Sequence, residues 1–454
     1  MRLVRRRIPT LLAASTFAAA AAPSAAQQLP DKLTLEDALR LAHAGNPIFR
    51  KTENDLELAS NGIRAAWAAF LPTLNPSINF SGGRSRTLTG QDDYGSPIQL
   101  PEARDYRSSS TGQSLNIGSI TLFDGGANIR TVRERRANYA MVDAQIAQQR
   151  IELDARVSRE FYQAIRAIRN IALEESLLAS AQERLTRTEE LLRLAARNRV
   201  DMLGARSDVK QGQQNVERAR GEADRARLTL AATLGLPAPA PLQLDTVLPP
   251  VFDPANLDVD WLVAQALRTS PAVRRGEHAV SAANQRAAAA RGARWPRLNA
   301  GVSYSRGMQL SSYEAFKQFN PQNWSFDVNY SLTLPLFTRF QISNQIAAEE
   351  AAARDADYDL RATRLALEKD IRTSIIDLNN AYRSLQLALE RVELSRERQQ
   401  LAQEQYRLGG ISFIELQNLF DRTAEAERQA LDARFTFISA RLALEEKLGA
   451  GLEN

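Results

Sequence analysis

Residues 151–198 read IELDARVSREFYQAIRAIRNIALEESLLASAQERLTRTEELLRLAARN and lie within a longer segment, 127–203, that contains neither Gly nor Pro. Residues 336–408 form a second such segment. Because Gly and Pro are the strongest helix breakers, each segment predicts one helix of about 65–70 residues, roughly 100 Å long. Ordinary globular helices average about a dozen residues. Two unusually long helices therefore dominate the predicted fold.

Apolar residues recur in alternating steps of three and four along both segments, which is the spacing of coiled coils. One seam consists of Leu178, Ala181, Leu185, Thr188, Leu192 and Ala195, and the other of Ile371, Ile375, Leu378, Tyr382, Leu385, Leu389 and Val392. A shorter helix is expected after each long one. The pattern predicts two helical hairpins, at about 127–234 and 339–448.

The hairpins belong to a module that occurs twice. LTLEDALRLAHAGNP at 33–47 resembles VDWLVAQALRTSP at 259–271, and ATLGLP at 232–237 resembles EKLGAG at 446–451. Corresponding residues of the two copies are 224 positions apart at Pro72 and Pro296, but 214 positions apart at Phe123 and Phe337. The first copy therefore has a longer loop between Pro72 and Phe123. We assign residues 27–235 and 258–454 to two tandem repeats. The Pro-rich residues 236–257 between them predict an extended linker.

Each copy also contains short helices followed by two alternating segments. These lie near 73–82 and 113–123 in the first copy and near 297–306 and 324–335 in the second. In FDVNYSLTL, residues 326–334, apolar and polar residues alternate, so a strand would have one apolar and one polar face. A length of about ten residues suits a tilted transmembrane strand. The half-buried strands of a soluble sheet would show the same alternation.

Residues 1–26 are typical of a secretory signal, with a basic start, apolar residues 11–22 and small residues before Gln27. The formal charge of the whole chain is +5, but the signal carries four arginines and no acid. The mature chain is therefore nearly neutral, which argues against a nucleic-acid partner. Beyond the signal, no apolar run is long enough for a membrane-spanning helix.

Enzymatic motifs are absent from the sequence. There is no Cys, and no phosphate-binding Gly-rich loop or catalytic triad stands out. The only histidines, His43 and His278, lie in separate helical regions. We expect no catalytic activity, no cofactor and no metal site.

The strand count has a consequence for assembly. Four strands cannot close a barrel, which needs about eight, and lipid does not tolerate an open sheet edge. If the strands cross a membrane, several chains must share one barrel. The predicted fold is mainly α with a small β part. Three chains would form a 12-stranded outer-membrane β-barrel continuous with a long periplasmic α-helical, coiled-coil barrel.

The order of these segments resembles the TolC family of outer-membrane efflux proteins over about residues 33–450. QYRLGGISFIELQNL at 405–419, FLPTLN at 70–75 and LTLPLF at 332–337 carry the likeness. The resemblance implies a homotrimer in the outer membrane of a Gram-negative bacterium, in contact with its lipid. It also implies a passive, porin-like exit duct that docks on a periplasmic adaptor (membrane fusion) protein and an inner-membrane transporter.

The turns of the two hairpins are the candidate functional site. Gly409 and Gly410 predict a left-handed helix end, and Ser412 with Glu415 predicts a capping box for the next helix. The first copy has Asn198 and Asp201 in a similar arrangement, with Asn198 expected to adopt a positive φ in place of the missing glycines. The two acids either cap their helices only or, repeated by trimer symmetry, form a carboxylate ring that favours cations.

The resemblance adds roles for individual residues. Acids just past this tip form the pore constriction of the family; Glu415 matches the first, uncharged Asn418 matches the next, and Asp421 follows one turn later. Tyr406 matches a tyrosine that holds the tips closed, whereas Ile411 replaces the arginine that locks them. The residues expected to serve tip turns, gating and adaptor docking are Ala195, Asn198, Arg199, Tyr406, Gly409, Gly410 and Ser412.

Three functions fit these features. The first is the exit duct of an efflux system for small toxic compounds or drugs, and the second is the same duct in type I protein secretion. The third is a periplasmic coiled-coil scaffold without a pore. The transporter class (RND, ABC or MFS) would decide the substrate, and the duct sequence does not specify it.

Overall fold

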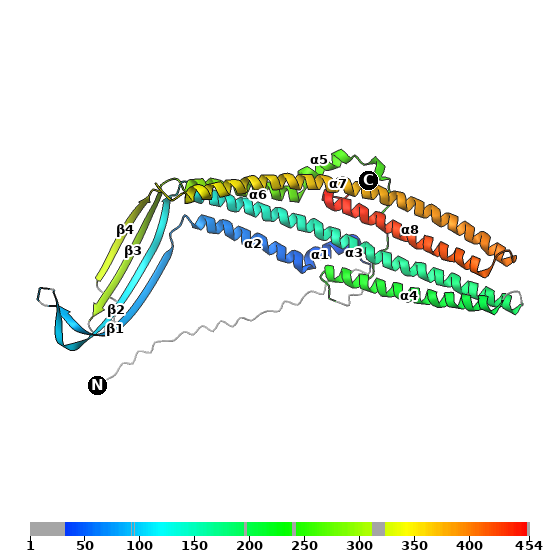
Figure 1. The fold of residues 1–454 in the computed structure, drawn as a ribbon, viewed down its shortest axis with the longest axis horizontal. Helices are drawn as coiled ribbons and strands as arrows, with labels where there is room; N and C mark the ends of the chain where they lie inside the picture. Colours follow the sequence, from blue (N-terminus) through cyan, green and yellow to red (C-terminus); the bar gives the residue numbers. More distant parts are fainter. Residues whose placement is uncertain are drawn as a thin grey trace, which may run out of the picture.

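The computed structural model describes residues 32–91, 93–94, 96–194, 198–237, 242–310 and 323–451. These residues form an elongated molecule with a sheet at one end and long helices along the rest of its length (Figure 1). The expected signal, 1–26, and the tip residue Ala195 lie outside the described residues.

The same order of elements occurs twice along the chain. The first half contains α1 (Leu35–Gly45), α2 (Pro47–Ala68), β1 (Leu74–Gln91), β2 (Pro97–Phe123), α3 (Ala127–Arg193) and α4 (Arg199–Thr233). After a 3₁₀ turn, Pro254–Asn256, the second half contains α5 (Val259–Thr269), α6 (Pro271–Gly292), β3 (Arg297–Leu310), β4 (Asn323–Thr333), α7 (Gln341–Arg407) and α8 (Phe413–Leu448). The two long helices, α3 and α7, contain 67 residues each, as the Gly- and Pro-free segments predict.

Local sequence signals set the ends of the short helices. The side chain of Thr34 accepts a hydrogen bond from the backbone N–H of Asp37, whose carboxylate reaches back to Thr34 in a capping box. Asn46 ends α1, and its side chain accepts from the backbone N–H groups of Ile48 and Phe49, 3.0 Å away in each case. Asn46 thereby also begins α2.

The four strands form one antiparallel sheet in the order β1-β2-β3-β4. The first two strands are longer than the alternating pattern predicts, because their ladder runs unbroken from Leu74↔Ile117 to Thr87↔Arg104. This extension is rich in Ser, Gly and Arg, so apolar alternation does not mark it. β4 ends at Thr333, before Pro335, which has no N–H for the ladder.

The linker packs on helices from both halves of the chain. Leu242 and Leu244 are buried in a core cluster with Phe161 and Leu230, while Leu33 forms a parallel bridge with Leu244. Arg169 of α3 donates a hydrogen bond to the Thr246 carbonyl at 3.1 Å. On the other half, Arg434 of α8 donates to the Pro249 carbonyl at 3.0 Å. Apart from the 3₁₀ turn that Pro254 begins, the described part of the linker forms no helix.

The predicted seams pack largely as expected. In α7, Ile371, Leu378 and Leu385 are buried against α5 and α8. Leu389 is 49% exposed, so its assignment to this seam is wrong. The buried row continues from Leu385 to Val392, a step of seven residues, and Leu389 lies about 40° around the helix from Leu385, at the edge of this row.

The sheet-to-helix junctions differ between the halves in a way that predicts a stabilising substitution. Arg339 has φ 50°, whereas the corresponding residue of the first half is Gly125, with φ 69°. A left-handed backbone costs a non-glycine residue about 1–2 kcal/mol, and glycine loses about 0.5–1 kcal/mol more backbone entropy on folding. We expect Arg339→Gly to raise the free energy of unfolding by roughly 0.5–1 kcal/mol in urea titrations. The control Ala347→Gly, on the exposed face inside α7, should lower it. Destabilisation by Arg339→Gly would contradict the prediction.

Candidate functional site

The two hairpin turns lie together at the end of the molecule farthest from the sheet (Figure 1). Gly409 has φ 80°, and its N–H donates to the Tyr406 carbonyl while that of Gly410 donates to the Gln405 carbonyl at 2.8 Å. This is the predicted left-handed helix end. The capping box of Ser412 and Glu415 is also confirmed.

The first turn is built differently. The side chain of Asn198 accepts from the backbone N–H of Asp201 at 2.9 Å, so it caps α4 as expected. Its φ is −96°, and the predicted positive φ is wrong. An N-cap residue takes an extended backbone because its side chain must reach forward to the second or third N–H of the helix. Arg199 is exposed in the first turn of α4.

Glu415 is exposed while it caps α8. Its Oε2 accepts from the Ser412 backbone N–H at 2.9 Å and from the Ser412 hydroxyl at 3.1 Å. These hydrogen bonds to the Ser412 backbone and side chain hold the pKa of Glu415 below its usual value. The carboxylate therefore keeps its negative charge near the tip.

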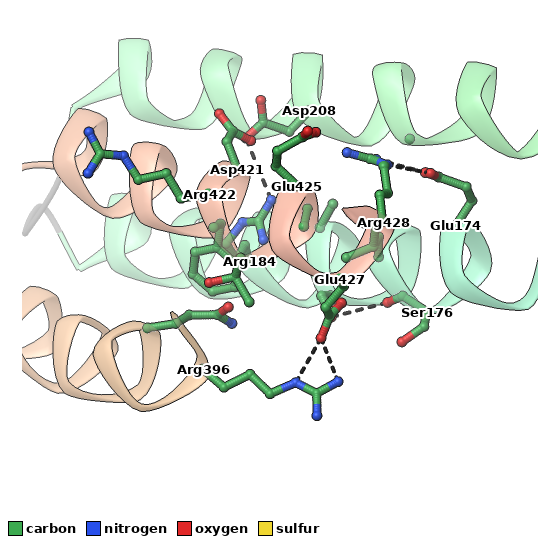
Figure 2. Close-up of a pocket in the computed structure, with 18 of the residues that line it drawn as sticks. Glu174, Ser176, Arg184, Asp208, Arg396, Asp421, Arg422, Glu425, Glu427 and Arg428 are labelled. Atoms are coloured by element: carbon green, nitrogen blue, oxygen red, sulfur yellow. Dashed lines mark hydrogen bonds and ion pairs between the residues drawn. The ribbon is translucent and has the colours of Figure 1, made fainter. Parts of the chain in front are cut away.

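Glu415 and Asp421 do not line the same cavity. Glu415 lines a cavity of about 460 Å³ with Asn418 and Ile411. Asp421 instead lines a larger cavity of about 770 Å³ between the two hairpins, where Figure 2 shows it beside Asp208. Asp421 lies six residues after Glu415, which is a rotation of about 240° around the axis of α8. The two side chains therefore lie on different sides of the helix.

A half-buried charge cluster joins the hairpins at this cavity. Arg184 of α3 lies 3.9 Å from the ring centre of Phe420 and 3.8 Å from Asp208 of α4. Gln417 of α8 donates to Asp208 at 2.7 Å. Burial raises the pKa of Asp208 and lowers that of Arg184. No sequence pattern marks this cluster, because its members come from three different helices.

A second contact between the hairpins is a bidentate ion pair. Nε and Nη2 of Arg428 in α8 lie 2.6 Å and 3.0 Å from the two carboxylate oxygens of Glu174 in α3 (Figure 2). The side chain of Glu174 is only 7% exposed. Farther from the tip, Arg166 and Asp432 form an exposed pair at 2.7 Å between the same two helices.

Apolar residues join the two hairpin tips. Tyr406, Phe413 and Leu416 form a buried cluster that includes Ala205 of the first hairpin. A Cβ at Gly204 would lie 2.9 Å from Cε1 of Phe413, so the ring packs directly on the α4 backbone. Ile411, at the position of the expected locking arginine, packs against the same cluster. The described contact between the tips is therefore largely apolar.

The sheet at the other end of the molecule has two unlike faces. Across all four strands, one face carries the apolar residues Leu74, Ile78, Phe80, Leu115, Ile117, Leu298, Val302, Tyr304, Phe326, Val328, Tyr330 and Leu332. Cross-strand serine pairs lie on the opposite face, including Ser77–Ser114 at 2.7 Å and Ser305–Ser325 at 2.8 Å. Among the described residues, no helix packs on either face (Figure 1).

One face of α7 carries large apolar residues that the described chain leaves exposed. Leu387, Leu394, Leu401 and Leu408 repeat every seven residues and are 61–80% exposed. A heptad row of this kind normally packs against another helix.

Membrane-spanning helices and metal-binding clusters are both absent from the described residues. No described helix is long and apolar enough to cross a membrane. The described residues contain no cluster of three or more His, Cys, Asp or Glu that could hold a metal ion. His43 contacts the carboxylate of Asp154 instead.

Comparisons with known proteins agree with the fold. The family model "Outer membrane efflux protein" matches residues 38–236 and 262–450. The cation efflux system protein CusC of Escherichia coli O157:H7 is 25% identical over 417 residues, covering 88% of this chain and 84% of CusC. The pyoverdine export outer membrane protein OpmQ of Pseudomonas putida is 24% identical over 422 residues, covering 89% and 84%.

A crystal structure of CusC has the same fold, with a TM-score of 0.74, 19% identity and 92% coverage of both chains. The chain thus belongs to the outer membrane efflux protein family, whose members are channels rather than enzymes, and is located in the Gram-negative outer membrane with its helical part in the periplasm.

Proposed function

We propose that three copies of this chain form a passive exit duct that conducts small toxic compounds or drugs across the outer membrane. The observation that carries the proposal is the uncovered sheet with one apolar and one polar face. An apolar face of this size is stable in contact with lipid, and four strands must share a barrel with other subunits to leave no open edge. Three subunits would supply twelve strands.

The exposed leucine row of α7 supports the same assembly. Covering Leu387, Leu394, Leu401 and Leu408 with a helix of a neighbouring subunit would bury the row and close the long helices into a periplasmic α-barrel. In this homotrimer the hairpin tips would surround the periplasmic opening.

The tips would also meet the periplasmic adaptor, and through it the inner-membrane transporter that supplies the energy. Arg199, Gly409, Gly410 and Ser412 are exposed there and are the proposed docking residues. Asn198 shapes the first turn, and Tyr406 is buried, so we assign these two to holding the turn and the tip contact. Because the two turns differ, the adaptor would meet two kinds of surface.

Asp201 and Glu415 are the proposed constriction residues, with Asn418 as a neutral neighbour and Asp421 set back between the hairpins. We expect Asp201→Asn with Glu415→Gln to lower the cation-to-anion permeability ratio of the duct by on the order of a few fold. Asn418→Asp should raise it. Reversal potentials across planar bilayers in a salt gradient measure both effects, and an unchanged ratio in both variants would contradict the assignment.

The nature of the substrate is tested in cells. Relatives are named for cation efflux and for pyoverdine export, so small solutes are the leading class for this duct. Deletion of the gene should sensitise the cell to a subset of small toxic compounds, and the wild-type gene should restore resistance. Loss of one secreted protein with no new sensitivity would instead support type I protein secretion.

A further inference from the structure

The polar face of the four-stranded sheet carries almost no charge. We follow this face along β3 from Arg297 to Gly307 and across the paired positions of the other strands, where alternate residues share one side. Arg297 and Asp327 are the two charged residues of this described stretch. Its other positions hold only Asn, Ser, Thr and Gly: Asn75, Ser77, Asn79, Gly112, Ser114, Asn116, Thr121, Asn299, Gly301, Ser303, Ser305, Gly307, Asn323, Ser325, Asn329, Ser331 and Thr333.

The two charged residues lie on neighbouring strands but far apart. Asp327 of β4 pairs with Ser303, and Arg297 at the start of β3 pairs with Thr333. Asp327 and Thr333 are six residues apart on β4, which is about 20 Å along the strand, so the carboxylate and the guanidinium do not meet. Both residues are exposed.

Contacts on this face show how little its side chains extend. A Cβ at Gly301 would lie 2.5 Å from Oδ1 of Asn329, so the Asn329 side chain lies flat over the backbone of β3. The serine hydroxyls bond to one another across strands, as Ser305 and Ser325 do at 2.8 Å. The face is therefore a low wall of neutral groups from which two charges project.

Threefold symmetry would turn each charged residue into a ring. In the proposed barrel, the three copies of Asp327 would lie at one height and the three copies of Arg297 at another, about 15 Å nearer the helices at a strand tilt of about 40°. Twelve strands about 4.8 Å apart at this tilt give a backbone radius of about 12 Å. A short aspartate side chain would then hold its charge about 10 Å from the axis.

This distance determines when the rings act on a passing solute. The Debye length is about 10 Å at 0.1 M salt, 30 Å at 0.01 M and 3 Å at 1 M. The potential of the Asp327 ring would therefore reach the axis at low salt and be screened at high salt. A constriction only a few Å wide would keep its selectivity at both concentrations.

We propose that Asp327 and Arg297 form two rings of opposite charge that together set the charge selectivity of the barrel lumen. The inference rests on the proposed trimeric duct, because only a barrel turns this face toward a lumen. Since the two rings carry equal and opposite charge, the barrel would admit hydrated solutes of either sign and leave charge selection to the hairpin tips.

The test measures reversal potentials of the full-length trimer in planar bilayers at mean KCl concentrations of about 0.02 M and about 1 M. All variants carry Asp201→Asn and Glu415→Gln, so that the two tip acids contribute no charge. At low salt, Asp327→Asn should lower the cation-to-anion permeability ratio on the order of three-fold, and Arg297→Gln should raise it by a similar factor. The double variant should return to the ratio of the background, and at 1 M the differences should vanish.

Two matched variants control for general charge and for misfolding. Arg306 lies on the same strand as Arg297 but on the opposite face, so Arg306→Gln should leave the ratio unchanged. Combining Asp327→Asn with Asn329→Asp moves the carboxylate two residues along the same face of β4 and should restore the background ratio.

The outcomes separate this inference from the duct itself. Equal ratios in Asp327→Asn and Arg297→Gln at low salt, or shifts in the same direction, would overturn the inference. An Arg306→Gln shift as large as that of Arg297→Gln would overturn it by showing a general charge effect. Shifts that persist at 1 M would overturn it by placing the residues in a narrow constriction. A wild-type chain that neither trimerises nor conducts would instead refute the proposed duct.

Discussion

Arg428→Met is expected to lower the free energy of unfolding of the helical part by about 3–5 kcal/mol, because it leaves the buried charge of Glu174 without its partner. The two side chains are joined by hydrogen bonds of 2.6 Å and 3.0 Å, and Glu174 has almost no access to water. Urea titration of the purified protein, followed by far-UV circular dichroism, measures the change.

Two further variants make this test specific. Arg166→Met removes a cation from an ion pair between the same helices whose side chains are 50% and 55% exposed, and should cost less than about 1 kcal/mol. Combining Glu174→Met with Arg428→Met should restore most of the loss, since no buried charge then remains. If Arg428→Met costs no more than Arg166→Met, the buried pair does not hold the hairpins together.

Phe413→Ala is expected to separate the hairpin tips and increase conductance. The ring fills the space above Gly204 and packs with Tyr406 at a centroid distance of 6.3 Å, so its removal costs about 3–5 kcal/mol of packing. Because the described contact between the tips is largely apolar, that loss should favour a more open periplasmic end. Single-channel recordings in planar bilayers measure it as larger or more frequent open events.

The neighbouring residue provides the control for this variant. Ile414 lies on the same turn of α8 but is 68% exposed, so Ile414→Ala should leave both stability and conductance nearly unchanged. Wild-type conductance in Phe413→Ala would show that contacts other than the apolar cluster close the tips.

Much of the fold follows from local features of the sequence. The absence of Gly and Pro predicts α3 and α7, and the caps at Asn46, Gly409 and Ser412 are visible as short motifs because they involve neighbouring residues. The outer parts of β1 and β2 could not be recognised, because Ser, Gly and Arg there carry no apolar alternation. Only pairing with the partner strand makes these residues extended.

The candidate site was predictable to a smaller degree. Glu415 and Asn198 are predictable from the sequence because helix capping involves neighbouring residues. The prediction of a positive φ for Asn198 is wrong, because it assumes that this turn needs a left-handed residue in place of the missing glycines. Arg184, Asp208 and Glu174 were missed. Their partners lie on other helices, and the coiled-coil pattern marks apolar rather than charged contacts.

The central claim is that this chain forms a trimeric duct through the outer membrane. The most direct measurement is the current across a planar bilayer after addition of the purified full-length protein. We predict discrete, uniform conductance steps from the trimer, with the cation preference that Asp201 and Glu415 would impose. A trimer or monomer that never yields such steps, although folded and mixed with the bilayer, would contradict the account and support a periplasmic coiled-coil scaffold without a pore.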